Sequence, residues 1–508
     1  MTPAVRTTRY RDFIAAARRH TPSTLLPALA AVSASQFDGG AYVRGPGEVI
    51  FPWVIAAAAR ENITFGNEHR STATVAKKDL GRLRDLFINL DEPFLDSVGQ
   101  PDALESFLVR TAFEQFPYQH SRYEDMSRIL LLFDRDYTGL GCRVLSSAAW
   151  TELLGLSVDA FMRTAFFIMV GARVNAGWFD PRWLDQPNLQ PALNALDVSG
   201  PQVMNIFRRI FATDVETVRR RVLEERKSDS RLHRYEFNPL VDKPFVLMPD
   251  HRYLAPNVYF VAQRLSPAAL YYVGWESLGR AFADDLGVVT EVYVGEQLAL
   301  ANAGNILHDV EYAKGQRAAD YIVVLPGLTV VIEVKSARVS PPGRLDQQGY
   351  LDDLNRDVGK ALKQIKRTGD MIRAGHPAFA SVDPTRDIRG IVVTAEPHYL
   401  LNSQIYRDVI PDPEYQTVIL SLSELEHAVA AAHAGDPAGL FAALTTPGPV
   451  GTYDVAKAIA AHERSLGVTK ARNPLLDDAY KRAWGPLDAA ALETGPLTAL
   501  PSAGHRRR

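Results

Sequence analysis

The clearest pattern of apolar positions in this chain is a pair of short runs, residues 321–325 and 328–334, on either side of Pro326-Gly327. Runs of this length that are rich in β-branched residues are typical of strands buried on both faces. Proline followed by glycine suits the two central positions of a type II turn. The pattern therefore predicts a β-hairpin with a tight turn.

The turn sets which residues of the two strands face each other. If the loop consists of the Pro-Gly pair alone, Asp320 falls opposite Glu333, with Cβ atoms roughly 5 Å apart. Lys335 lies two residues beyond Glu333 and points to the same face of the sheet. A longer symmetric loop would keep this pairing, whereas an asymmetric loop would break it.

Two facing carboxylates and a lysine at the end of an apolar hairpin point to metal chemistry. Carboxylates at this separation repel unless a proton or a cation lies between them. A hard divalent cation removes the repulsion, and oxygen atoms are the ligands that Mg²⁺ prefers. The lysine would orient or deprotonate a water, or stabilise charge on a phosphate. We therefore expect Mg²⁺ as the cofactor, with Mn²⁺ as the alternative ion.

The chain before the hairpin is expected to be mainly helical. Residues 1–235 carry apolar positions at helical spacing and are assigned to a helical region that binds substrate or a partner. Its last helix is predicted over residues 201–227. Residues 236–272 alternate proline with short apolar runs, which indicates an extended connector that packs against the protein.

The segment around the hairpin alternates helices and strands, which predicts an α/β layer with a mixed sheet over residues 273–430. Gly287 is expected to end one helix before a second begins at Glu291, and Ser423 is expected to cap a helix after the last strand. The other expected elements are a helix over 352–374 and strands over 306–312, 389–395 and 417–421. Residues 431–508 are expected to form a helical extension with a poorly ordered tail.

Composition narrows the class of protein. The 508 residues are 46% hydrophobic and 23% charged, as in an ordinary soluble globular protein of two or three domains. The net charge of −3 gives no overall attraction to nucleic acid, so a basic surface must be local. A single cysteine, Cys142, excludes an intrachain disulfide and a cysteine-rich zinc module. The apolar run 164–172 is too short to span a bilayer, so we expect a cytoplasmic protein with no membrane partner.

Asp320, followed on the next strand by Glu333-Val334-Lys335, resembles the PD-(D/E)xK nuclease superfamily (restriction-endonuclease-like fold) over residues 275–426. Ala319 stands where the family has proline, a frequent departure. The resemblance implies a metal-dependent endonuclease that hydrolyses phosphodiester bonds, with DNA as the first expected substrate and RNA as the second.

Several residue roles follow from the resemblance alone. Asp320 and Glu333 would be metal ligands together with the carbonyl of Val334, and Lys335 would position the attacking water. An acid on the preceding helix would also serve the site. Glu291 is the first choice for this metal or water ligand and Glu296 the alternative, because residues five apart on a helix do not share a face.

The helix after the hairpin carries further candidates. Gln364, in a catalytic role, and Lys360 lie one turn apart and would form a polar pair near the site. The candidate nucleic-acid-binding residues are Lys360, Lys363, Arg367 and Arg338, and their cluster offers a local basic field. For Lys360 and Gln364, the competing interpretation is an ordinary exposed helix face. For Lys335, it is a simple salt bridge with Glu333 or Asp320.

Three functions remain open. The first is an Mg²⁺-dependent DNA endonuclease, in bacterial defence or DNA processing by analogy. The second is a non-catalytic nucleic-acid-binding or assembly module that retains the fold. The third is a sensor whose nuclease is activated by a partner, with a homodimer or protein partner bound through the N-terminal helical region.

Overall fold

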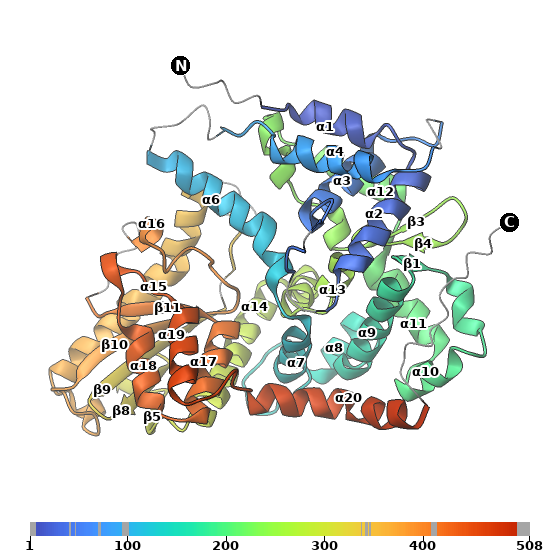
Figure 1. Cartoon of the computed structure of the whole chain (residues 1–508). Helices are drawn as coiled ribbons and strands as arrows, with labels where there is room; N and C mark the ends of the chain where they lie inside the picture. The colour runs from blue at the N-terminus through green and yellow to red at the C-terminus, as the bar shows by residue number, and fades with distance from the viewer. Residues whose placement is uncertain are drawn as a thin grey trace, which may run out of the picture.

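The computed structural model describes residues 7–494, except 40–41, 46, 70–72, 94–100, 337, 341–343, 345–346 and 408–413. The helical half and the α/β layer lie side by side, and α20 runs from the α/β layer beneath the helical half (Figure 1). The tail was expected to be poorly ordered from Gly485 onward; residues 485–494 belong instead to α20 (Pro474–Thr494), and the rest of the tail lies outside the described residues.

Most of the chain before residue 266 is helical, as predicted. The α-helices here are α1 (Tyr10–Ala17), α2 (Pro22–Gln36), α3 (Pro52–Phe65), α4 (Lys77–Ile88), α6 (Pro101–Gln115), α7 (Arg122–Phe133), α8 (Ser147–Leu154), α9 (Val158–Val174), α10 (Gln190–Ala195), α11 (Gly200–Ile206), α12 (Val215–Glu224) and α13 (Val258–Gln263). Short one-turn helices are η1 (Phe116–Gln119), η2 (Pro181–Asp185), η3 (Phe207–Phe211), η4 (Ser230–Tyr235) and η5 (Pro239–Val241). The strands are β1 (Trp178–Phe179), β2 (Ala212–Thr213), β3 (Phe245–Leu247) and β4 (Tyr253–Leu254).

The second part of the chain alternates helices and strands. Its helices are α14 (Pro267–Leu300), α15 (Gln347–Arg373), η6 (Pro377–Phe379), α16 (Gln404–Arg407), α17 (Leu422–Ala434), α18 (Pro437–Thr445), η7 (Pro449–Gly451), α19 (Val455–Ser465) and α20 (Pro474–Thr494). Its strands are β5 (Asn305–His308), β6 (Glu311–Ala313), β7 (Gln316–Arg317), β8 (Tyr321–Leu325), β9 (Leu328–Lys335), β10 (Asp387–Thr394) and β11 (Thr417–Ser421).

The central sheet has the strand order β11-β10-β9-β8-β5. The strands β9, β10 and β11 are parallel, while β8 and β5 are antiparallel to their neighbours. Successive residues of β9 enter different cores: Val331 packs in the cluster of α15, and Val330 and Ile332 pack in the cluster that includes α14 and α17. The predicted mixed sheet, covered on both faces, is confirmed.

Helix α14 is broken at Gly279, not at Gly287 as the sequence suggested. Gly279 has φ 60° and ψ −139°, a conformation that L-residues rarely adopt and glycine tolerates. The segments on either side fold tightly together, since a Cβ on Gly274 would lie 2.2 Å from the ring of Phe282. Gly287 stays inside the helix, where a Cβ would make only an ordinary contact with Ser336 Oγ at 3.7 Å.

The predicted helix over residues 201–227 is also wrong as a single element. It divides into α11, the π-helical turn η3, β2 and α12. The break arises from tertiary contacts, because β2 pairs in parallel with β3. Asp214 then caps α12 by accepting a hydrogen bond from the backbone N–H of Thr217 at 2.8 Å.

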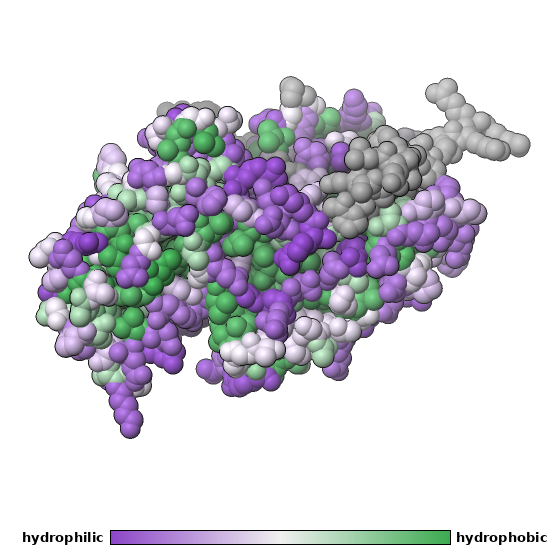
Figure 2. Space-filling view, turned by 90° about the horizontal axis from the view of Figure 1, so that it is seen from below, coloured by the Kyte–Doolittle hydropathy of each residue, from purple (hydrophilic) through white to green (hydrophobic). Residues whose placement is uncertain are grey.

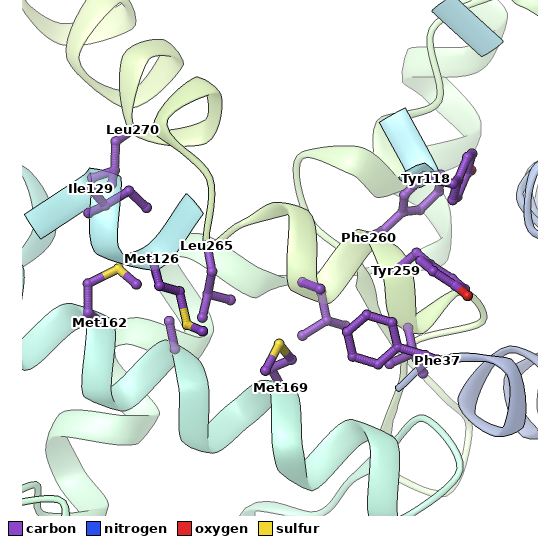
Figure 3. Close-up of a cluster of buried hydrophobic side chains, with 14 of the residues drawn as sticks. Phe37, Tyr118, Met126, Ile129, Met162, Met169, Tyr259, Phe260, Leu265 and Leu270 are labelled. Atoms are coloured by element: carbon purple, nitrogen blue, oxygen red, sulfur yellow. The ribbon is translucent and has the colours of Figure 1, made fainter. Parts of the chain in front are cut away.

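The segment 236–272 packs against the protein as expected, but only part of it is extended. It contributes β3 and β4 to a four-stranded sheet and then forms α13. Figure 3 shows Phe260 and Leu265 of this segment in one buried cluster with Met126 and Met162. The segment is therefore part of the core of the helical half.

After the last strand, the helix α17 is capped by Ser421 and not by Ser423. Ser421 Oγ accepts from the backbone N–H of Glu424, and the Glu424 carboxylate accepts from the backbone N–H of Ser421 at 2.7 Å. This reciprocal capping box begins the helix directly at the end of β11.

One stretch, Ser147–Val174, is apolar and long enough by composition to cross a membrane, and 50% of its most apolar window is buried inside the protein. It comprises α8 and α9, and Phe161 and Ile168 of α9 lie in the core. A core helix passes the same test, so a buried helix remains the better interpretation. Seen from below, polar residues cover much of the surface with apolar residues between them (Figure 2).

A buried charged network joins the helical half to the α/β layer. Arg128 of α7 donates from Nε and Nη2 to the two oxygens of Glu426 on α17, each at 2.6 Å. Tyr293 of α14 donates to the same carboxylate at 2.6 Å, and Asp125 accepts from Arg128 Nη1 at 2.7 Å. Glu426 is fully buried, so its charge depends entirely on these partners.

Replacing Glu426 by alanine is expected to destabilise the protein by about 3–5 kcal/mol, because Arg128 would keep a buried charge with half of its partners removed. Thermal or urea unfolding measures the loss. Asp478→Ala is the control, since its pair with Lys481 is exposed and contributes little. Equal unfolding midpoints for Glu426→Ala and wild type would contradict the role of this network.

Candidate active site

The β8–β9 hairpin has the predicted register. Leu325 pairs with Leu328, and Tyr321 at the other end pairs with Ile332. Gly327 has φ 71°, as the third position of a type II turn requires. Continuing the same register by one pair places Asp320 opposite Glu333.

Side-chain contacts bring the hairpin residues together. The backbone N–H of Val334 donates to Asp320 Oδ2 at 2.7 Å, and the backbone N–H of Asp320 lies 3.4 Å from Glu333 Oε2. Lys335 Nζ donates to Glu333 Oε1. The Glu333 side chain is only 1% exposed, whereas that of Lys335 is 23% exposed. The two carboxylates and the lysine therefore converge, as the sequence predicted.

The environment disfavours two negative charges. Burial raises the pKa of Asp320 and the nearby Glu291 carboxylate raises it further, while the hydrogen bond from Val334 lowers it. Burial likewise raises the pKa of Glu333, with Asp320 adding to the shift and Lys335 opposing it. Without a further cation, the pair therefore tends to hold a proton.

Helix α15 holds the ends of both strands. Gln364 Oε1 accepts from Lys335 Nζ at 3.0 Å, so Gln364 reaches the site as expected. One turn later, Thr368 Oγ1 accepts from the backbone N–H of Ala319 at 2.8 Å and fixes the residue before Asp320. Sequence reasoning missed Thr368, although its i+4 spacing from Gln364 was a usable signal.

The acid of α14 on the site side is Glu291. Its carboxylate lies 2.8 Å from Nε2 of His308, and its backbone carbonyl accepts from the Tyr321 hydroxyl at 2.9 Å. His308 stacks on Tyr321 with ring centroids 4.6 Å apart. His308 therefore borders the site, and its charge lowers the pKa of Asp320.

Glu296 points elsewhere. Its carboxylate accepts from Arg135 at 2.6 Å, in the turn that follows α7. Of the two candidate acids, Glu291 is therefore the one beside the hairpin, because Glu296 lies on a different face of α14.

The predicted nucleic-acid-binding residues divide into two groups. Lys360 and Lys363 are exposed on α15 and form no ion pair with a described residue. Arg367 is also exposed and donates to the Tyr312 hydroxyl at 3.0 Å. Arg338 differs from the expectation: its side chain is 9% exposed, is paired with Glu396 and lies over the Tyr271 ring. It is committed to internal contacts, so the exposed basic surface is on α15.

Asp320, Glu333 and Val334 offer the kind of oxygen ligand that a hard divalent cation prefers, although the ligands are few. Among the described residues, no three His, Cys, Asp or Glu side chains lie close enough together to hold a metal ion. The buried Glu333 carboxylate and the partly buried Asp320 carboxylate remain, and Val334 adds a backbone carbonyl that points to the same strand edge as its N–H, toward Asp320. Magnesium commonly binds one or two carboxylates and keeps several waters, so this set suffices.

Comparison with protein-family models, with curated proteins and with solved structures finds no match for this chain.

The raised pKa values predict a pH-dependent stability. A carboxyl whose pKa is higher in the folded protein stabilises it below the ordinary value, about 4, and this stability is lost as pH rises through the raised value. In EDTA, Glu333→Gln should therefore gain in Tm relative to wild type as pH rises from about 5 to 8. Added Mg²⁺ should raise the Tm of wild type at pH 8 but not that of the variant.

Exposed Glu224→Gln is the control and should behave as wild type in both buffers. Equal Mg²⁺ shifts for Glu333→Gln and wild type would contradict metal binding at the hairpin.

Proposed function

We propose that this chain is a divalent-metal-dependent nuclease of the restriction-endonuclease-like, PD-(D/E)xK, type that hydrolyses phosphodiester bonds in DNA, with RNA as the second candidate substrate. The observation that carries the proposal is the cross-strand pairing of Asp320 and Glu333 beside Lys335. It is supported by a mixed sheet whose α15 presents Gln364 to the same point.

The chain's own residues have separable roles in this proposal. Asp320, Glu333 and the Val334 carbonyl would hold Mg²⁺, which when bound polarises a phosphate oxygen and lowers the pKa of a water. Lys335 is held by Gln364 within reach of Glu333, where its ammonium would orient the attacking water or neutralise the phosphate. Thr368 keeps Asp320 in place through the preceding backbone N–H.

The exposed face of α15 supports the choice of a polyanionic substrate. Lys360 lies one turn before Gln364 on the same side of α15, and Lys363 is exposed on the adjacent side of the helix; neither forms an ion pair with a described carboxylate. A local basic surface of this kind attracts phosphates even in a chain with net charge −3.

Cleavage of linear, circular and single-stranded DNA and of RNA in Mg²⁺, Mn²⁺ or EDTA tests the activity. Glu333→Ala and Lys335→Ala should each lower the cleavage rate by about 10²–10⁴-fold, because each removes a group that acts on the reacting centre. Exposed Glu224→Ala and Lys457→Ala are the matched controls and should cleave as wild type. Cleavage that persists in EDTA or in both site variants would refute the mechanism.

The basic face makes a separate prediction for binding. Lys360→Ala with Lys363→Ala should weaken DNA binding in EDTA and flatten the plot of log affinity against log salt by about 0.9 per lost phosphate contact. Fluorescence anisotropy across a salt series measures both quantities. The double variant Lys457→Ala, Lys481→Ala removes the same charge from exposed positions outside α15. If both double variants lose affinity equally, the effect is one of net charge, and α15 is not the binding face.

A further inference from the structure

Three aromatic side chains gather near the start of α14, before the break at Gly279. Tyr272 and Trp275 are 36% and 42% exposed, and Tyr271 is partly buried. The rings of Tyr271 and Trp275 are nearly parallel, with 16° between their planes and centroids 6.1 Å apart, and Tyr271 meets Tyr272 at 5.4 Å. Exposed aromatic side chains are ordinary when they are scattered singly, whereas a contiguous group indicates a binding surface. We call these three residues the aromatic patch.

Two arginines after β9 border the aromatic patch and share one carboxylate. Arg338 is paired with Glu396, and its guanidinium carbon lies 3.9 Å from the centroid of the Tyr271 ring. Arg344 donates to the Tyr272 hydroxyl at 3.4 Å and lies 3.6 Å from the other oxygen of Glu396. One carboxylate cannot neutralise two guanidinium groups, so this edge of the patch carries excess positive charge. The Arg344 side chain is 36% exposed and is the accessible cation of the two.

The charges of α14 beside the patch do not cancel this excess. Glu276 and Arg280 are both exposed and are opposite in sign. The surface therefore combines exposed aromatic rings with a net positive charge. Flat apolar rings joined by phosphates match both features, because bases stack on aromatic side chains while arginine pairs with phosphate.

The aromatic patch lies close to the candidate active site. Arg338, which contacts Tyr271, follows Lys335 by three residues, so their Cα atoms are at most about 11 Å apart. Phe282 meets the Tyr271 ring at 5.7 Å and precedes Glu291 by nine helical residues, or about 14 Å along α14. Proteins that bind single strands cover about 4–16 nucleotides, so one short strand can span the patch and the hairpin.

We propose that Tyr272 and Trp275 form a platform on which unpaired bases of single-stranded DNA stack as the strand reaches the hairpin, with Arg344 holding a phosphate. This proposal rests on the proposed nuclease function and assigns its substrate to the single-stranded form. A duplex suits the platform poorly, because its bases are already stacked on each other and taking one out costs free energy. Stacking uses the face of any base, so the platform tolerates any sequence.

Fluorescence anisotropy of the full chain in EDTA, with a labelled oligothymidine of about 12 nucleotides, tests the platform. Wild type should bind this strand more tightly than a duplex of equal length. Tyr272→Ala and Trp275→Ala should each weaken binding by about 5- to 100-fold, the effect of losing one stacked base. Tyr272→Phe and Trp275→Phe keep an aromatic ring and should retain most of the affinity. An abasic strand of equal length should bind wild type and the alanine variants alike, because it offers phosphates without bases.

Tyr123→Ala and Phe237→Ala are matched controls, since these aromatic side chains are 39% and 44% exposed elsewhere on the protein, and both variants should bind as wild type. Unchanged affinity in both Tyr272→Ala and Trp275→Ala, or an equal loss on the abasic strand, would overturn the platform. Equal affinity for duplex and single strand would overturn the strand form, and tighter binding of oligouridine would overturn the choice of DNA.

The two proposals fail separately, because binding in EDTA needs no cleavage. The predicted losses of binding without Mg²⁺-dependent cleavage by wild type would refute the nuclease and support the platform. Mg²⁺-dependent cleavage that Glu333→Ala abolishes, together with single-strand binding that the alanine variants of the platform leave unchanged, would support the nuclease and overturn the platform.

Discussion

The antiparallel register of β8 and β9 is the constraint on which the candidate site depends. Because successive residues of a strand face opposite sides, Glu333 and Lys335 share the α15 side of the sheet with Val331. A slip of one residue would turn both to the α14 side and exchange apolar and charged residues between the two cores. Both faces are buried, so the packing of β9 resists such a slip from either side.

The helices that complete the site are held by the other half of the protein. Helix α15 packs against α6, and α14 is tied through Tyr293 to the buried Arg128–Glu426 pair. Glu296 also accepts a hydrogen bond from Arg135 beyond the end of α7, on a different face of α14 from Glu291. The helical half therefore positions the acid of α14, although it contributes no side chain to the pair of carboxylates.

The features that the sequence predicted well are those set by local chemistry. The Pro-Gly turn determines the hairpin register, and the apolar runs determine strands with two buried faces. The errors share a tertiary cause. Gly279 was missed because the break depends on Phe282 packing against Gly274. The residue that caps α17, Ser421, is also the last residue of β11. Arg338 was expected on the surface because nothing in the local sequence indicates that it pairs with Glu396.

The pair of carboxylates is also what favours the proposed metal site over an ordinary salt bridge. Lys335 neutralises one negative charge, and it is bonded to Glu333. Among the described residues, the Asp320 carboxylate accepts a hydrogen bond only from the backbone N–H of Val334, so burial and the nearby Glu291 carboxylate together keep its pKa raised. A structural salt bridge would need one carboxylate, and a second beside it only adds a cost of burial. The second carboxylate is therefore the residue that a salt bridge leaves unexplained and that the proposed divalent cation, bound by both carboxylates, would account for.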